Sequence, residues 1–224
     1  MADATKMKGS CGSLPNWHDQ LVIIGAGGHG KVFADIARRS GRYHSFLFLD
    51  DDPAIQEAAW IPVAGDCSKV GEYLLSSDIF VAVGSAATRK RIMEQLLKEG
   101  AKIPVLVHPH AMVGSGVEIA PGTAVMAGAV INADARIGKG SIVNTCASVD
   151  HDCIVGDYAH IAVGAHLAGN VRIGDGTWIG AGATVINNIS VDGDITVGAG
   201  AVVVRDLRDS GIYVGVPAKL IQSP

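Results

Sequence analysis

The sequence has few aromatic residues, no excess of positive charge and no long apolar run. Phe, Trp and Tyr make up 5% of its 224 residues, and the formal net charge is −4. With no basic stripe to neutralise phosphates, binding to nucleic acid is not expected. No apolar run approaches the length of a membrane span, so membrane insertion is not expected either. Residues 1–20 lack the apolar core of a signal peptide, and we expect a cytoplasmic protein.

The sequence also lacks the cysteine spacing of a metal site. Its four cysteines, which we expect to be reduced, are Cys11, Cys67, Cys146 and Cys153. A metal bound by Asp150, His151 and Asp152 is disfavoured as well, because adjacent side chains on a flat strand diverge. We therefore expect no metal cofactor.

The sequence is instead marked by a repeat. Every sixth residue from Val107 to Val203 is Val, Ile or Leu, for seventeen consecutive positions, which we call the markers. A period of six belongs neither to a helix nor to an ordinary alternating strand. It is typical of a hexapeptide parallel β-helix, in which a regular coil stacks on itself. The richness in glycine and the scarcity of aromatic residues agree with such a solenoid.

A second register accompanies the markers. The residues four positions after them, from Ala111 to Ala201, are all small or apolar, so both sets are expected to point inward. Glycine directly follows six markers, as at Gly114 and Gly198, where we expect a corner to need a permissive backbone. The pattern resembles the left-handed β-helix of hexapeptide-repeat transferases, in which three hexads form one triangular coil of eighteen residues.

Residues 21–106 are predicted to form a small β-α-β-α-β unit, half of a doubly wound fold. Strands are expected at residues 21–24, 46–49 and 79–83, with a helix at 31–39 and a second helix after the third strand. Residues 107–203 form the predicted β-helix. Residues 1–20 are expected to be a tail or linker, and residues 204–224 a C-terminal cap.

A glycine-rich turn lies between the first predicted strand and helix. Gly25, Gly27 and Gly30 match the dinucleotide-binding fingerprint, in which glycines let a phosphate approach the N–H groups at a helix start. Asp50 and Asp51 end the second strand, where they can accept hydrogen bonds from a ribose or a base. The turn predicts a nucleotide or nucleotide-sugar site, and a tight turn without a ligand is the alternative.

His151 is the candidate general base. It follows the marker Val149 by two positions and should project outward, and Asp152 is placed to hydrogen-bond its ring and raise its basicity. Gly169, eighteen residues later, should stack over His151 and expose a backbone N–H of the kind that stabilises an oxyanion. A base, a carboxylate and a donor would then meet on one patch.

Other interpretations stay open at this point. Residues 150–152 can equally be a polar corner, and outward histidines are often only solvated, as we expect for His108, His110 and His166. A cysteine nucleophile is disfavoured, since no base partner is evident for Cys146 or Cys153. His160 lies half a coil from His151 and cannot share its face within one chain, although it can reach a site shared with a neighbouring chain.

Several segments resemble sugar acetyltransferases of the sialic-acid O-acetyltransferase type, and most closely the bacterial UDP-4-amino-sugar N-acetyltransferases of the bacillosamine pathway of protein glycosylation. The segments are residues 24–30, 48–51, 143–145, 149–153, 160, 164–170 and 215–219. The resemblance implies a homotrimer, with a UDP-amino-sugar on the small domain and acetyl-CoA in the groove between neighbouring β-helices.

The resemblance also implies individual roles. His151 would take a proton from the 4-amino group of the sugar, Asp152 would tune it, and Asn144 would help to set the geometry. His160 and the Gly169 amide would contact the acetyl-CoA thioester. The remaining implied contacts are Ala181 and Ala199 with acetyl-CoA, and Gly27, Gly28, His29, Asp50, Asp51 and Gly84 with the UDP-sugar. Many relatives carry Asn after the glycine of the third strand, whereas here Ser85 follows Gly84.

We therefore predict an acetyl-CoA-dependent N-acetyltransferase that acts on the 4-amino group of a UDP-4-amino-4,6-dideoxy-N-acetylhexosamine. The amine would attack the thioester directly, so a base within reach is sufficient. The nearest alternative is an O-acetyltransferase acting on a sugar hydroxyl, such as that of a sialic acid. An NAD-dependent oxidoreductase and a non-catalytic trimeric scaffold are the alternatives from other classes.

Overall fold

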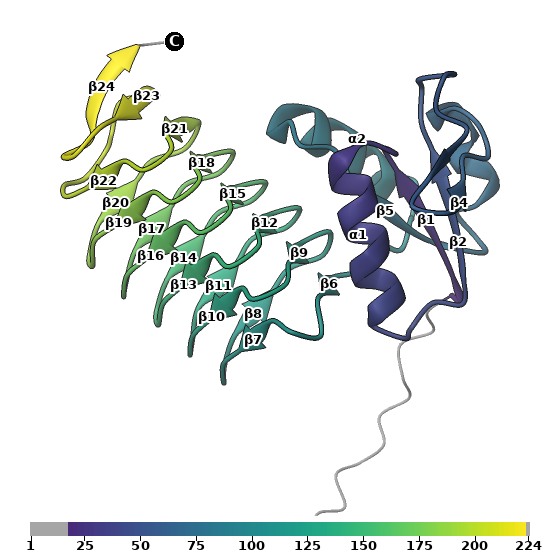
Figure 1. Ribbon diagram of the computed structural model, residues 1–224, viewed down its shortest axis with the longest axis horizontal. Helices are drawn as coiled ribbons and strands as arrows, with labels where there is room; N and C mark the ends of the chain where they lie inside the picture. Colours follow the sequence, from purple (N-terminus) through teal and green to yellow (C-terminus); the bar gives the residue numbers. More distant parts are fainter. Residues whose placement is uncertain (1–17, 223–224) are drawn as a thin grey trace, which may run out of the picture.

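The computed structural model describes residues 18–222, which form an α/β unit followed by a β-solenoid (Figure 1). Most of the predicted tail, together with Cys11, lies outside the described residues. The boundaries proposed at 20/21, 106/107 and 203/204 stay predictions.

The α/β unit is built on three parallel strands in the order β2-β1-β5. The strands are β1 (Gln20–Ile24), β2 (Ser45–Leu49) and β5 (Asp78–Val81), with α1 (Gly28–Arg39) after β1 and α2 (Ala86–Lys98) after β5. Apolar clusters cover both faces of this sheet, as is usual for a parallel sheet. The predicted elements are present, but α1 begins earlier than expected because the glycine-rich turn itself supplies its first turn.

Three short elements between β2 and β5 were not expected. They are the hairpin strands β3 (Glu57–Ala58) and β4 (Ile61–Pro62) and the 3₁₀ helix η1 (Cys67–Glu72). Each is too short to produce a periodic pattern of apolar residues.

The solenoid has three faces, and the coils stack as parallel strands on each of them (Figure 1). We name each face after one strand near its middle. The β13 face contains β7 (Met112–Val113), β10 (Val130–Ile131), β13 (Ser148–Val149), β16 (His166–Leu167), β19 (Thr184–Val185) and β22 (Val202–Val203). The β14 face contains β8 (Glu118–Ile119), β11 (Arg136–Ile137), β14 (Ile154–Val155), β17 (Arg172–Ile173) and β20 (Ser190–Val191).

The β15 face begins with β6 (Leu106–Val107), β9 (Ala124–Val125), β12 (Ile142–Val143), β15 (His160–Ile161), β18 (Trp178–Ile179) and β21 (Ile195–Val197). Two C-terminal strands extend it: β23 (Gly211–Val214) runs parallel to β21, and β24 (Lys219–Gln222) runs antiparallel to β23. The chain after Val203 thus leaves the period of six but still adds strands to this face.

The period of six is explained by the coil. Every marker is the last residue of a strand, and the pairing of Ser148 with His166 and of His160 with Trp178 places partners eighteen residues apart. From Val125 onward the markers are buried, and with the small residues of the second register they form one continuous core. The predicted solenoid is therefore present.

The expectation for the glycines that directly follow markers is wrong. Positive φ angles occur three residues after a marker, as at Asp134 (φ 59°) and Asp152 (φ 61°). A Cβ on Gly138 would lie 2.5 Å from the carbonyl carbon of Gly156 in the next coil, and a Cβ on Gly114 would lie 2.8 Å from the nitrogen of Ala133. These glycines are needed because consecutive coils approach closely.

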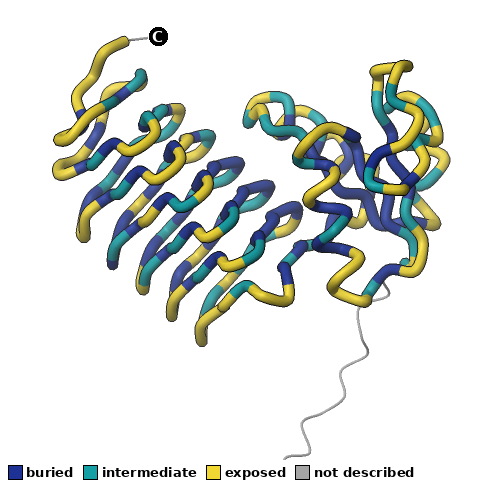
Figure 2. The backbone as a smooth tube through the Cα atoms, viewed as in Figure 1, coloured by how far each residue is buried: buried dark blue, intermediate teal, exposed yellow. Residues whose placement is uncertain are grey.

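The α/β unit packs on the first coils of the β15 face. Leu106, Ala124 and Ile142 share one buried cluster with Phe33 of α1. In Figure 2 the coil segments nearest the α/β unit are largely buried. This packing brings the segments that follow β1 and β5 beside the solenoid, where His29 contacts His160 and Arg89 contacts Gly140.

Candidate active site

His151 lies at the corner between the β13 and β14 faces, where Asp150 and Asp152 flank it. Its Nδ1 is 2.8 Å from Asp152 Oδ2. Its backbone N–H donates to Asp150 Oδ1 at 2.8 Å, and Asn132 Nδ2 donates to the same oxygen at 2.7 Å. Asp152 occupies the left-handed backbone region, which Asp tolerates better than most residues. Two carboxylates therefore hold the His151 backbone and ring.

The pKa of His151 is raised above its usual value. The main cause is the hydrogen bond with Asp152, followed by the negative charge of Asp150. Because both stabilise the imidazolium, the neutral ring is a stronger base than an isolated histidine. With Nδ1 bonded to Asp152, Nε2 is the nitrogen left to accept a proton.

Gly169 lies directly over the His151 ring, as the eighteen-residue spacing predicts. A Cβ at this position would lie 2.6 Å from His151 Nε2, so a larger residue would displace the ring from this position. Within residues 18–222 the Gly169 N–H has no hydrogen-bond partner. The basic nitrogen and a free backbone donor thus face the same space.

His160 lies elsewhere, on the outer side of β15, and is 5% exposed. Its ring stacks on Trp178 with centroids 5.2 Å apart and meets the His29 ring edge-on at 5.6 Å. Asn144 Oδ1 accepts from Thr145 N–H at 2.7 Å, which turns Asn144 Nδ2 toward His160 Nε2 at 3.0 Å. Nε2 is therefore an acceptor, and the proton of the neutral ring is on Nδ1.

His160 Nδ1 is buried and has no partner among the described residues. Burial lowers the pKa of His160 to about 4, and the charges of His29 and Arg89 act in the same direction. The ring is therefore neutral near pH 7 and offers one N–H donor. The opposite pKa shifts of His151 and His160 suit them to different roles, a base and a donor.

The glycine-rich turn forms the start of α1. Gly25 has φ 101°, and a Cβ on Gly30 would collide with the Gly25 carbonyl oxygen, so both positions require glycine. A Cβ on Gly27 or Gly28 would meet nothing within 4 Å. The backbone of Gly27 and Gly28 is exposed at the start of α1, where a phosphate can approach the first N–H groups of the helix.

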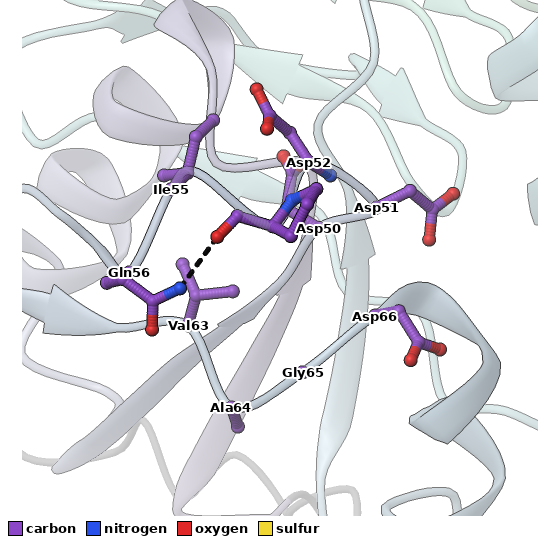
Figure 3. Close-up of a pocket in the computed structure, with 10 residues that line it drawn as sticks. Asp50, Asp51, Asp52, Ile55, Gln56, Val63, Ala64, Gly65 and Asp66 are labelled. Carbon is purple, nitrogen blue, oxygen red and sulfur yellow. Dashed lines mark hydrogen bonds between the residues drawn. The ribbon is translucent and has the colours of Figure 1, made fainter.

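Asp50 and Asp51, the two predicted aspartates, already accept hydrogen bonds from backbone N–H groups. Asp50 accepts from Ala26 N–H at 2.6 Å and from Asp52 N–H at 2.9 Å, so it holds the glycine-rich turn in place. Asp51 accepts from Cys67 N–H at 2.9 Å. Both line a cavity of about 330 Å³ between the end of β2 and the β4–η1 loop (Figure 3). This volume is at the lower end for small-ligand sites.

Arg89, a residue that the sequence analysis did not single out, joins the two parts of the chain. It is 1% exposed and donates to the carbonyls of Val83 and Gly84, both at 2.8 Å. It also donates to the solenoid carbonyls of Gly140 at 2.6 Å and Tyr158 at 2.7 Å. Since a Cβ on Gly84 would lie 3.3 Å from the His29 ring, Arg89 positions the loop that supports His29.

The predicted site residues fall into three places. His151, Asp152 and Gly169 form one corner. Gly27, Gly28, His29, Asp50, Asp51 and Gly84 gather at the carboxyl ends of the parallel strands, where His29 meets His160 and, through it, Asn144. Ala181 and Ala199 are exposed at a third place, the corner between the β15 and β13 faces. As expected, His151 and His160 do not meet within one chain.

Two features are absent from residues 18–222. No three His, Cys, Asp or Glu side chains there are grouped so as to hold a metal ion. No helix in this part of the chain is long and apolar enough to cross a membrane.

Comparison with protein families matches residues 20–96 to the PglD N-terminal domain. A curated UDP-N-acetylbacillosamine N-acetyltransferase of Bacillus subtilis is 36% identical over 110 residues. That match covers 48% of this chain and spans about half the length of the curated relative, 51%.

Solved structures resemble the whole fold. The acetyltransferase domain of PglB from Neisseria gonorrhoeae has a TM-score of 0.89 at 43% identity, covering 91% of this chain and 100% of that one. The same domain has been solved with acetyl coenzyme A, with a TM-score of 0.88. A variant of perosamine N-acetyltransferase from Caulobacter crescentus, in which one histidine is replaced by asparagine, was solved with CoA and GDP-perosamine. It has a TM-score of 0.87 at 39% identity, covering 90% of this chain and 96% of that one.

The fold class is an α/β unit followed by a left-handed parallel β-helix, as predicted, and it is that of hexapeptide-repeat acyltransferases. Within that class, the chain belongs to the bacterial amino-sugar N-acetyltransferases of the bacillosamine type.

Proposed function

We propose that the chain transfers the acetyl group of acetyl-CoA to the 4-amino group of a UDP-4-amino-4,6-dideoxy-N-acetylhexosamine, with His151 as general base. The observation that carries this proposal is the corner where the His151–Asp152 pair and the free Gly169 N–H face one space. A base beside an oxyanion donor is what acyl transfer to an amine requires.

In this mechanism the neutral amine nitrogen attacks the carbonyl carbon of the thioester. Negative charge then develops on the carbonyl oxygen, to which the Gly169 N–H donates. His151 Nε2 takes the proton that the amine loses, and Asp152 stabilises the resulting imidazolium. The C–S bond breaks as the carbonyl re-forms, and His151 returns the proton to the departing CoA sulfur. No covalent enzyme intermediate is needed.

Acetyl-CoA is the proposed donor because unsatisfied donors are available to it. The Gly169 N–H and the buried His160 Nδ1–H both lack partners within residues 18–222. Buried donors in native structures normally have partners, so an unsatisfied one points to a ligand. Ala181 and Ala199 would line one wall of the same groove. The acetyl-CoA complex of the Neisseria domain supports this assignment.

The nucleotide sugar is proposed to bind at the start of α1. Its diphosphate would meet the open backbone of Gly27 and Gly28, with His29 and Gly84 beside it. Asp51 would contact the nucleoside from the adjoining cavity, while Asp50 supports the turn. The Caulobacter relative, solved with GDP-perosamine, supports a nucleoside diphosphate amino sugar as the acceptor.

A homotrimer is proposed because one chain does not assemble the whole site. In a three-faced coil, the corner that carries His151 lies opposite the β15 face, on which the α/β unit packs. The base of one chain would therefore serve a sugar held by its neighbour. Exposed Met112, Val113 and Val163 along the β13 face and its border offer apolar surface for such contacts. We propose a cytoplasmic location, since Cys67, Cys146 and Cys153 are unpaired thiols.

The test is CoA-thiol release from acetyl-CoA with either a UDP-4-amino-sugar or free sialic acid as acceptor. Wild type and H151A are compared, with H44A as a matched control because His44 is an exposed histidine of the α/β unit. Release with the amino sugar that is lost in H151A and kept in H44A supports the proposal. Release only with sialic acid would instead identify an O-acetyltransferase, and unchanged activity in H151A would exclude His151 as the base.

A further inference from the structure

One column of outward side chains runs up the β15 face. Ala124, Ile142 and His160 in this column are 0%, 1% and 5% exposed, whereas Trp178, the next residue, is 48% exposed. The α/β unit covers the first part of the column, and Trp178 is the first side chain beyond the cover. An indole at this border therefore presents apolar surface where the two parts of the chain meet.

Trp178 is connected to the proposed nucleotide site through a row of rings. His29 follows Gly28 in the first turn of α1, and its ring lies 5.6 Å from that of His160. The His160 ring in turn stacks on Trp178 at 5.2 Å with an interplanar angle of 17°. The row leads from the open start of α1 to the exposed indole, so a group attached to a diphosphate at α1 can extend along it.

One face of the indole packs on a ring that is itself fixed. His160, on which it stacks, is buried and is fixed by the contact of its Nε2 with Asn144. One face of Trp178 is therefore covered by a rigid ring, and the exposed area belongs to the rest of the indole. A preorganised aromatic surface binds the apolar side of a ligand with little loss of conformational freedom.

We propose that Trp178 is a specificity residue whose indole packs against the apolar face of the acceptor sugar and its C6 methyl group. This inference rests on the proposed function, which supplies a 4-amino-4,6-dideoxy sugar as the acceptor. A hydroxyl at C6 would lose its hydrogen bonds to water against the indole without a replacement. Trp178 thus selects a nucleoside diphosphate amino sugar that is deoxygenated at C6.

Trp60 provides a matched control. It is also a tryptophan of the described chain and is 87% exposed, but it lies in the turn of the β3–β4 hairpin and contacts no other ring within residues 18–222. Replacing Trp60 removes an indole from the surface without changing the row of rings formed by His29, His160 and Trp178. An effect shared by both tryptophans would reflect general surface properties rather than recognition of the sugar.

The first experiment measures acetyl transfer to two acceptors that differ only at C6, the UDP-4-amino-4,6-dideoxy sugar and its 6-hydroxy counterpart. Wild type should prefer the deoxy sugar by about tenfold in kcat/KM, as expected for one apolar group in a pocket. In W178A this preference should fall to near one through a higher KM for the deoxy sugar, while the KM for acetyl-CoA stays unchanged. W178F should restore most of the preference, and W60A should behave as wild type.

Two results would overturn the inference. One is a W178A variant that keeps the wild-type preference between the two sugars. The other is a variant in which the KM for acetyl-CoA rises and that for the sugar does not, which would place the indole against the acyl donor.

A binding measurement separates this inference from the proposed function. Addition of the UDP-amino-sugar should change the tryptophan fluorescence of wild type and W60F but not that of W178F, and UDP alone should have little effect. This readout needs no catalysis. If wild type acetylates neither sugar, the proposed function fails, and the fluorescence still decides the role of Trp178. The same fluorescence change in W178F as in wild type would exclude contact between the sugar and the indole.

Discussion

The His151 and Asp152 side chains contact each other, with Nδ1 and Oδ2 2.8 Å apart, although the two residues are adjacent in the chain. On a flat strand adjacent side chains point to opposite sides. Here the chain turns a corner, and the φ of 61° at Asp152 departs from the extended conformation. The corner therefore allows a pairing that a strand would prevent.

This pairing predicts the pH dependence of the reaction. Because the hydrogen bond with Asp152 raises the pKa of His151, its neutral form requires a higher pH than that of an ordinary histidine. The value of kcat/KM should therefore rise with pH through one ionisation and then level off. In D152N the midpoint should move to lower pH and the plateau should fall about tenfold or more. A pH–rate profile of wild type and D152N checks this, and an unchanged midpoint in D152N would contradict the role of the carboxylate.

Gly169 should tolerate no side chain over the His151 ring. In G169A the added Cβ would lie 2.6 Å from Nε2, so the ring or the coil must shift away from the acyl group. We expect kcat to fall about 100-fold, comparable to the loss of an oxyanion donor. The thermal midpoint should hardly change, because Gly169 does not have a positive φ.

The control for this variant is G71A, since a Cβ on Gly71 in η1 meets nothing within 4 Å. Steady-state kinetics and circular dichroism on both variants make the comparison. A G169A enzyme with wild-type kcat would show that this corner is not the reaction centre.

The sequence alone predicts the solenoid and the stacking of Gly169 over His151, because both depend on local or strictly periodic spacing, whereas it placed His151 on a face rather than at a corner. Each marker ends a strand, and eighteen residues bring Gly169 over His151. The same reasoning misassigned the glycines after the markers. It considered only the backbone conformation of one residue, whereas glycine is required there because a Cβ would collide with the backbone of the neighbouring coil.

The contacts around His160 could not be predicted in this way. Its meeting with His29 depends on how the α/β unit packs on the β15 face, which is set by a cluster of side chains far apart in the sequence. Arg89 bonds only to backbone carbonyls, so no residue type in the sequence identifies its partners. Trp178 occupies an outward strand position, which the repeat leaves free to vary.

His160 should act as a neutral donor. Its pKa of about 4 keeps the ring uncharged near pH 7, so H160F should not move the midpoint of the pH–rate profile. The loss of the Nδ1–H should lower kcat/KM about tenfold, the usual effect of one buried hydrogen bond. The profile of H160F tests this. A midpoint that shifts in H160F as it does in D152N would mean that His160 itself takes up the proton.

Arg89 should be important for stability. Replacement by methionine leaves the buried carbonyls of Gly140 and Tyr158 without their donors. We expect R89M to lower the free energy of unfolding by about 3 kcal/mol or more. R91M, an exposed position on the same helix, should change it by less than about 0.5 kcal/mol. Urea unfolding of both variants measures the difference, and equal midpoints would contradict the bridging role of Arg89.

The proposed shared site predicts complementation between two impaired variants, H151A and H160F. If His151 of one chain serves a sugar beside His160 of its neighbour, a trimer that mixes H151A with H160F contains some sites with both histidines intact. After random assembly of equal amounts, about a quarter of all sites should have both histidines intact. Such a site needs an H160F chain to supply His151 and an H151A chain to supply His160, and each choice has a probability of about one half. Co-refolded mixtures should therefore exceed the summed activity of the separate variants.

A double variant with both changes in one chain, mixed with wild type, gives the reference for dilution alone. If His151 and His160 worked within one chain, the mixture would show no gain over the summed activity of the separate variants, since every chain would lack one of the two histidines.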